Sequence, residues 1–253
     1  MRARVGRFAT AGEGSLSDRH GILDTILENL APIHRDGHKF VIAALALTLL
    51  FFLLWPPLGW LLAIVTLYVA YFFRDPERVT PTRDGLIVSA ADGAVSAIDR
   101  VRPPVELGLG EQQERVRVSI FLSVLDVHIN RAPVAGRIVR SIYVPGAFLN
   151  AASDKASEEN ERRSIVIQTP AGTEIAVVQI AGLIARRIVT FANEGDTVGV
   201  GQRFGLIRFG SRVDVYLPPG ATPLVAIGQR AVGGETVLAD LKSSEPERET
   251  RRS

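Results

Sequence analysis

The hydrophobic pattern of the chain is dominated by one long apolar segment, which runs from residue 40 to residue 73 and contains no charged side chain. Pro56 and Pro57 divide it into the halves FVIAALALTLLFFLLW and LGWLLAIVTLYVAYFF. Each half corresponds to about 24 Å of helix, which is short against the ~30 Å hydrocarbon core of a bilayer. The pattern therefore predicts a membrane-associated helical hairpin that dips into one leaflet or crosses thinly. A hairpin buried inside a soluble core is the alternative.

The segment before the hairpin, residues 1–39, has a different character. Residues 1–20 are rich in Gly, Ser and Arg, and the stretch GILDTILENLAPIH then predicts a short amphipathic helix. Basic residues flank the hairpin, Arg35 and Lys39 before it and Arg74 and Arg78 after it. Because basic flanks favour the cytoplasmic side, we expect both ends there. The apolar run starts late and lacks a small-residue cleavage site, which is not typical of a secretory signal.

Period-2 alternation replaces the helical pattern in the rest of the chain. Runs such as RVRVSIFL, SIVIQ and TEIAVVQI alternate with Gly-containing turn signals at close intervals. This pattern predicts a mainly β domain over residues 74–241 without the helices of a parallel α/β sheet. The last stretch, residues 242–253, is a charged tail that we expect to be disordered.

Two stretches of this domain, IVSAADGAVSAI and NEGDTVGVGQRFGLI, resemble hairpins of the flattened β-barrel in biotinyl and lipoyl carrier domains. Those carriers need a Lys at a hairpin tip, typically beside a Met, and the single Met of this chain is Met1. The likeness therefore implies a flattened β-barrel or sandwich without the carrier function.

Composition and motifs remove several classes of function. The formal net charge of +2 gives no basic footprint for a nucleic-acid partner. The chain has no Cys, and His128 is the single His of the β region, so no ligand pair has metal-binding spacing and we predict no metal. A phosphate-binding Gly-x-x-x-x-Gly-Lys loop and a Gly-x-Ser-x-Gly elbow are also missing from the sequence.

The stretch IRFGSRVDVYLP reads as a strand interrupted by Gly210 and Ser211. A Gly before Ser lets the carbonyl of residue 210 approach the Ser hydroxyl without obstruction by a Cβ atom. In a strained turn that hydroxyl can attack the carbonyl, and elimination from the resulting ester leads through dehydroalanine to an N-terminal pyruvoyl group. On the dipeptide alone, a glycine bulge in an ordinary strand is the better interpretation.

Five motifs and their order change that balance. They are FFRDPER, ADG, DVHINRAP, GLIARRI and GQRFGLIRFGSRVD, and the apolar pair precedes them. Over residues 72–217 the chain resembles the short form of phosphatidylserine decarboxylase, a membrane-bound pyruvoyl enzyme made as a self-cleaving proenzyme. The resemblance implies cleavage between Gly210 and Ser211, which yields a large chain 1–210 and a small chain 211–253 that stay together as a heterodimer. Ser211 would become the pyruvoyl cofactor and form a Schiff base with the substrate amine.

The resemblance also assigns helpers to this reaction. Asp92, in the motif ADG, is implied to take part in self-cleavage, although a turn former is its ordinary interpretation. His128 matches the family's D-x-H motif with Asp126, which implies proton transfer, whereas a lone His is more often a packing residue. Long-form relatives carry a second His three residues later, where this chain has Arg131.

Substrate contacts are assigned to three further residues. Arg186 and Arg187 follow each other, so they point to opposite faces of a strand, and one of them is a candidate for the substrate phosphate or carboxylate. Phe209 is a candidate pocket residue, with core packing as its alternative. We expect a phospholipid substrate, phosphatidylserine, and a peripheral or monotopic location on the cytoplasmic face of the cell membrane. A membrane-anchored β-barrel without enzymatic activity and a pyruvoyl decarboxylase for another amine are the competing hypotheses.

Overall fold

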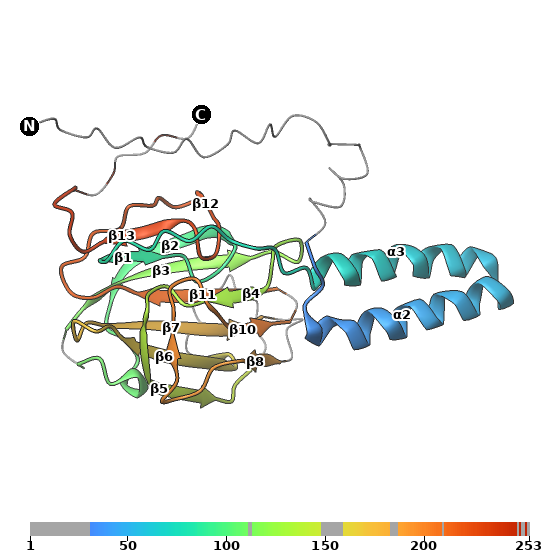
Figure 1. Ribbon diagram of the computed structural model, residues 1–253, viewed down its shortest axis with the longest axis horizontal. Helices are drawn as coiled ribbons and strands as arrows, with labels where there is room; N and C mark the ends of the chain where they lie inside the picture. The colour runs from blue at the N-terminus through green and yellow to red at the C-terminus, as the bar shows by residue number, and fades with distance from the viewer. Residues whose placement is uncertain are drawn as a thin grey trace, which may run out of the picture.

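The computed structural model describes residues 31–110, 113–147, 159–182, 187–208, 210–246, 248 and 251. The amphipathic helix predicted before residue 31 lies outside these residues, as do Arg186 and Phe209. In the described part, two helices project from one end of a β domain (Figure 1). A mainly β fold preceded by a helical pair was predicted from the sequence, and the structure confirms it.

The helical pair consists of α2 (Arg35–Leu54) and α3 (Pro56–Phe72). Trp55 between them is extended, with φ −156° and ψ 90°, and Pro56 then starts α3 at a position where its missing N–H costs nothing. The hydroxyls of Thr48 and Thr66 lie 2.9 Å apart and join the two helices. Proline therefore sets the turn, and small polar side chains hold the helices together.

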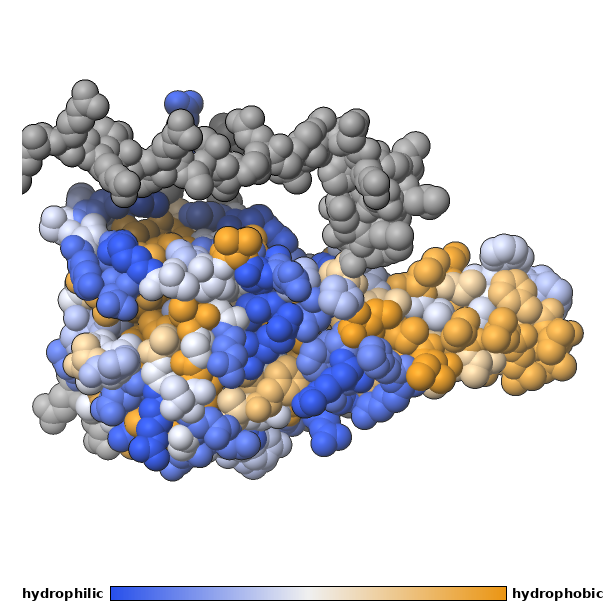
Figure 2. Space-filling model, viewed as in Figure 1, coloured by the Kyte–Doolittle hydropathy of each residue, from blue (hydrophilic) through white to orange (hydrophobic). Residues whose placement is uncertain are grey.

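The outer surface of this pair is apolar. The space-filling view shows hydrophobic residues over the projecting helices and a more hydrophilic surface on the domain (Figure 2). Large side chains such as Leu53, Trp60 and Leu67 are exposed by 85%, 68% and 72%. By length and composition α2 can cross a membrane, since it starts at Arg35 and so extends beyond the apolar run, whereas α3 is shorter. The hairpin is thus not buried in a soluble core.

The β domain is built from three antiparallel sheets. The largest has eight strands in the order β12-β2-β3-β11-β7-β6-β5-β9, and the smaller ones have the orders β4-β10-β8 and β1-β13. The strand bounds are β1 Leu86–Val88, β2 Gly93–Val101, β3 Arg115–Leu122, β4 Ile129–Arg131, β5 Gly136–Val144, β6 Arg162–Gln168, β7 Glu174–Ala181, β8 Ile188–Thr190, β9 Thr197–Val198, β10 Arg203–Ile207, β11 Ser211–Tyr216, β12 Arg230–Ala231 and β13 Val237–Asp240; a short 3-10 helix, η1, spans Val105–Leu107.

The main core fills the inner face of the large sheet. Alternate residues of β11, Val213 and Val215, are fully buried in it, as the period-2 pattern predicts. A second cluster covers the other face beneath η1 and includes Leu107 and Tyr216. Both faces of the sheet's centre are therefore covered, which leaves strand β11 buried along its whole length.

A third cluster joins the foot of the helices to the β domain. Phe72 and Phe73 at the end of α3 pack against Val127, Ile129 and Leu206. The guanidinium of Arg74 donates to the carbonyl of Leu125 at 2.7 Å, which ties the end of the helix to the loop before β4. The helical pair is therefore anchored at the same loop that carries His128.

Candidate active site

Ser211 is the first residue of strand β11, at the centre of the large sheet. It lies opposite Leu122 of β3 and Ala181 of β7, and six residues of β11 pair with each neighbour. Gly210 immediately before it has φ +64°, a left-handed conformation that glycine adopts without steric cost. The strand is thus hydrogen-bonded on both sides, while its first peptide bond follows a turn that requires glycine.

The hydroxyl of Ser211 is fully buried and has no hydrogen-bond partner among the residues that the structure describes. A buried hydroxyl usually finds a partner, because an unsatisfied one costs about 1–3 kcal/mol. An unpartnered nucleophile beside a left-handed glycine is suited to attack on the adjacent carbonyl. The residues here therefore fit the formation of a pyruvoyl group from this serine.

The ring of His128 lies beside this bond. Its Nδ1 lies 2.9 Å from the carbonyl oxygen of Asp126, and its Nε2 lies 3.2 Å from the amide nitrogen of Gly210. Because a carbonyl oxygen only accepts, Nδ1 carries the proton, and Nε2 accepts the Gly210 N–H with its lone pair. The imidazole is thus held in one tautomer, with its basic nitrogen beside the Gly210–Ser211 segment.

Burial also fixes the charge of this histidine. Its side chain is fully buried and packs against the Phe72 ring, with 4.4 Å between ring centroids. Desolvation lowers the pKa of His128 from 6.5 to about 4, against the opposing effect of the Asp126 carbonyl and carboxylate. At neutral pH the ring is therefore uncharged, which is the state that accepts a proton.

Asp126 shapes the loop that orients the ring. One carboxylate oxygen accepts hydrogen bonds from the backbone N–H and the hydroxyl of Ser123, at 2.8 and 2.7 Å, and the other accepts from Arg230. Burial raises the pKa of this carboxyl, but the bonds from Arg230 and Ser123 outweigh it, so the pKa of Asp126 is lowered. The charged carboxylate holds the turn, and the turn's carbonyl holds His128.

Asp92 lies beside this arrangement without contacting His128. Its carboxylate accepts from Arg78 at 2.7 Å and from the backbone N–H of Gly233 at 3.3 Å. Ala94, two residues later, lies two strands away from Arg212 across β3, a spacing of about 10 Å. Burial raises the pKa of Asp92 in spite of the opposing charge of Arg78 and the hydrogen bond from Gly233.

Arg131 occupies the position where long-form relatives have a second histidine, and its side chain is hydrogen-bonded to other parts of the fold. Its guanidinium donates to the carbonyls of Gly201 and Pro76, at 3.0 and 2.9 Å, and to Asp75 at 3.3 Å. These contacts fasten the segment that follows α3 to strand β4. The side chain at this position therefore organises the fold, and His128 remains the imidazole at the Gly210–Ser211 bond.

The buried side-chain amides of Gln179 and Asn130 and the ion pair between Arg78 and Asp92 belong to the site, and the sequence did not predict them. Gln179 donates to Asn130 at 2.7 Å, and it lies on the inner face of β7 diagonally opposite Ser211. Asn130 stands in the motif DVHINRAP and Arg78 in FFRDPER, so membership of the two motifs was the available signal. No motif marked Gln179, because a single polar residue within TEIAVVQI indicates only a strand with imperfect alternation.

The proposed substrate-binding residues are only partly described. Arg187 is exposed, and its carbonyl accepts the backbone N–H of Arg208 at 3.3 Å. Arg186 and Phe209 lie outside the described residues. The described residues contain no group of three His, Cys, Asp or Glu side chains that could hold a metal ion.

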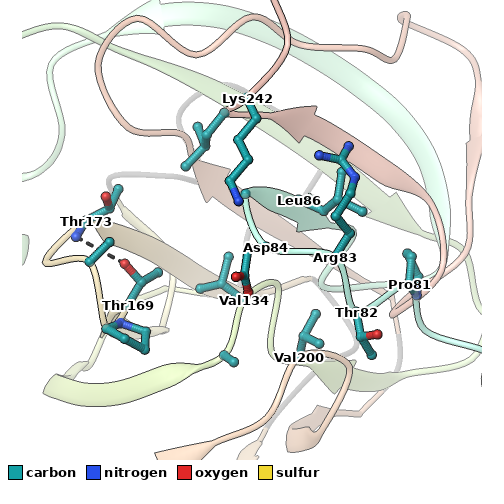
Figure 3. A pocket seen from close by; sticks show the side chains of 15 residues that line it. Pro81, Thr82, Arg83, Asp84, Leu86, Val134, Thr169, Thr173, Val200 and Lys242 are labelled. Carbon is teal, nitrogen blue, oxygen red and sulfur yellow. Dashed lines mark hydrogen bonds between the residues drawn. The ribbon is translucent and has the colours of Figure 1, made fainter.

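A cavity of about 480 Å³ lies at the other end of the sheet (Figure 3). Leu86, Val134 and Val200 line it, and Arg83 and Lys242 stand around it. It reaches the turn before Glu174, seven residues along β7 from the partner of Ser211, or about 23 Å. This cavity is therefore separate from the Gly210–Ser211 site.

Comparison with known proteins agrees with this geometry. Residues 65–239 match the family model described as phosphatidylserine decarboxylase. A curated relative from Cereibacter sphaeroides, named phosphatidylserine decarboxylase proenzyme, is 55% identical over 226 residues. The match covers 89% of this chain and 97% of the relative.

Proposed function

The chain belongs to the phosphatidylserine decarboxylase family, whose members are carboxy-lyases, and we propose that it converts phosphatidylserine to phosphatidylethanolamine and CO2 after cleaving itself between Gly210 and Ser211. The observation that carries the proposal is the unprotonated Nε2 of a fully buried His128, 3.2 Å from the amide nitrogen of Gly210. It lies one residue from a buried serine hydroxyl that has no partner in the described part of the chain.

Self-cleavage begins at the Ser211 hydroxyl. Its oxygen forms a bond to the carbonyl carbon of Gly210, the bond from that carbon to the nitrogen of Ser211 breaks, and the hydroxyl proton passes by way of His128 to that nitrogen. For this step Nε2 of His128 gives up its hydrogen bond from the Gly210 N–H and accepts one from the Ser211 hydroxyl instead. The ester that results then loses the α-proton of residue 211 and the carboxylate of Gly210, and water replaces the nitrogen, which leaves as ammonia.

A pyruvoyl group at position 211 supplies a carbonyl that condenses with the substrate amine and accepts the electron pair released with CO2. The protein's part is to position the substrate and to exclude water. The buried surroundings of Ser211 and the neutral His128 provide a dry site with one proton acceptor. We assign to His128 the proton transfer at this site and to Asp92, with Arg78, a supporting role in self-cleavage.

The two chains stay associated after cleavage because the cut falls at the start of a central strand. β11 pairs with β3 and β7 on opposite sides, and its Val213 and Val215 are buried in the main core. The small chain of residues 211–253 therefore remains part of the sheet, and the processed enzyme is a heterodimer.

The apolar helices supply the link to the lipid substrate. We propose that α2 and α3 insert into the cytoplasmic leaflet and that the enzyme is peripheral or monotopic at the cell membrane. Their exposed leucines and tryptophans support this location, since a soluble surface rarely shows so large an apolar area. A water-soluble amine would give no reason for this anchor, which favours a phospholipid over the alternative amine substrates.

Intact mass spectrometry tests the proposal together with a lipid assay. The purified protein should appear as two chains, and the small one should have the mass of residues 211–253 with serine replaced by pyruvoyl. Phosphatidylserine labelled in its carboxyl group should release CO2. An intact chain without activity would instead support the membrane-anchored barrel that acts as a scaffold.

A further inference from the structure

Positive charge gathers where the helical pair meets the β domain. Arg35 and Lys39 are exposed on the first turns of α2, and Arg187 is exposed just before β8. Arg208 follows the last residue of β10, and its guanidinium carbon lies 4.9 Å from the centroid of the Phe40 ring. Asp36 is the acidic side chain whose charge acts on Arg208, so the cations are in excess.

Among the described residues, no carboxylate forms an ion pair with Arg208, and other contacts hold it in place. Stacking on Phe40 orients its plane, and its backbone N–H binds the carbonyl of Arg187, which places the two arginines side by side. Its Nε is buried and has no hydrogen-bond partner among the described residues. Burial and the nearby charge of Arg187 both lower the pKa of Arg208, so the environment disfavours its charge as it stands. A bound anion would relieve both penalties.

The distance from this cluster to Ser211 suits a serine headgroup. Arg208 is three residues before Ser211, so the two backbones are at most about 10 Å apart. In phosphatidylserine, four bonds separate the amine nitrogen from the phosphorus, which is about 5 Å in extended form. An arginine side chain easily makes up the difference. A phosphate held at Arg208 therefore lets the amine reach position 211.

The depth in the membrane is also suitable. The apolar surfaces of α2 and α3 end where they meet the domain, so lipid phosphates would lie at the level of Arg35 and Lys39. Arg208 is at that level, against Phe40. We infer that Arg208, together with Arg187, binds the phosphate of the phospholipid headgroup and so selects a phosphate-bearing serine lipid. This inference rests on the proposed function and adds to it the residue that binds the substrate phosphate.

The test compares Arg208→Gln with Arg102→Gln in neutral detergent micelles, where no charged bilayer attracts the enzyme. Arg102 is an exposed arginine at the far end of β2 and serves as the matched control. With activity normalised to the cleaved fraction, Arg208→Gln should raise KM for phosphatidylserine about tenfold with little change in kcat. Arg208→Lys should recover part of that loss, since the charge remains.

Other sources of phosphate are separated by two further measurements. Inorganic phosphate should inhibit the wild type competitively and inhibit Arg208→Gln less, if the site recognises phosphate itself. Phosphatidylglycerol in the micelles tests whether a lipid phosphate that is not part of the substrate enters the site, and it should inhibit in the same way if it does. Inhibition by phosphatidylglycerol without a change in KM for phosphatidylserine in the variant would overturn the substrate assignment.

Arg208 lies close to the cleaved bond, so its variant can fail to process. In that case Arg187→Gln, at an exposed position, carries the test and should raise KM severalfold. An unchanged KM in the processed variant, or an equal rise in Arg102→Gln, would refute the inference. A wild-type protein that neither cleaves itself nor releases CO2 would instead refute the proposed function, so the two failures are distinguishable.

Discussion

Acidification should destabilise the fold through His128. The pKa of this histidine is lowered from 6.5 to about 4 in the folded protein, because the neutral ring is buried. Between these values the unfolded chain binds more protons than the folded one, so stability is fully present above pH 6.5 and is lost as the pH falls toward 4. The difference of about 2.5 pKa units corresponds to about 3 kcal/mol at pH 4, and to about 1.4 kcal/mol at pH 5.5.

Urea unfolding between pH 7.5 and pH 4 measures this effect. The Ser211→Ala background keeps the chain whole, so that unfolding does not depend on the association of two chains. The free energy of unfolding should decrease in this protein as the pH is lowered. When His128→Asn is added, this decrease should be smaller by about 3 kcal/mol. The neighbouring carboxyl of Asp92 has a raised pKa and opposes the trend in both proteins, so it cancels in the comparison.

An exposed histidine provides the control. His38 lies on the first turns of α2 and is exposed, and His38→Asn shows how much of the change comes from replacing a histidine outside the buried site. If the curves with and without His128 run parallel from pH 7.5 to pH 4, the ring is not buried in the neutral form, and its assignment as the proton acceptor loses its physical basis.

Three other predictions follow from the site and the helices. Ser211→Ala should stay uncleaved and release no CO2 while losing about 1 kcal/mol or less of stability, and a cleaved or active variant by gel and CO2 assay would contradict the pyruvoyl origin. Arg78→Gln should leave the buried carboxyl of Asp92 unpaired, slow self-cleavage in a timed gel and cost about 3 kcal/mol in urea unfolding; unchanged stability would exclude a structural role for this pair. Deletion of residues 40–73 should abolish flotation with lipid vesicles while far-ultraviolet circular dichroism still shows β structure, and continued flotation would refute the membrane role of the hairpin.

The sequence predicted the parts of the fold that depend on local pattern. Period-2 alternation located β11, in which Val213 and Val215 face the core, and the charge-free segment with its prolines located the helical pair. Strand neighbours were not predictable in this way. Ser211 pairs with Leu122 and Ala181, which lie far from it in sequence, and alternation alone does not specify which strands meet.

The candidate site was predicted to a similar degree. Gly210, Ser211 and His128 were selected as candidates through motifs, and the structure places the His128 ring at the Gly210 amide. The pairing of Asp92 with Arg78 was not foreseen, because an ion pair between two motifs leaves no mark in either one. The role of Arg131 was also open, since a changed residue in a family motif does not reveal its new partners, which here are Asp75 and two backbone carbonyls.

The position of the proposed cleavage site explains how the fold would survive a cut there. A break inside a strand would separate hydrogen-bonded residues, whereas the Gly210–Ser211 bond joins a left-handed turn to the first residue of β11. The new terminus would be held by the ladders of β11 to β3 and β7 and by its buried valines, and none of these contacts depends on the Gly210–Ser211 bond. His128, to which we assign proton transfer, lies before this bond, and Phe72 connects it to the helices by packing on its ring. The apolar helices, His128 and the start of β11 are therefore joined through noncovalent contacts that a cut between Gly210 and Ser211 would leave intact.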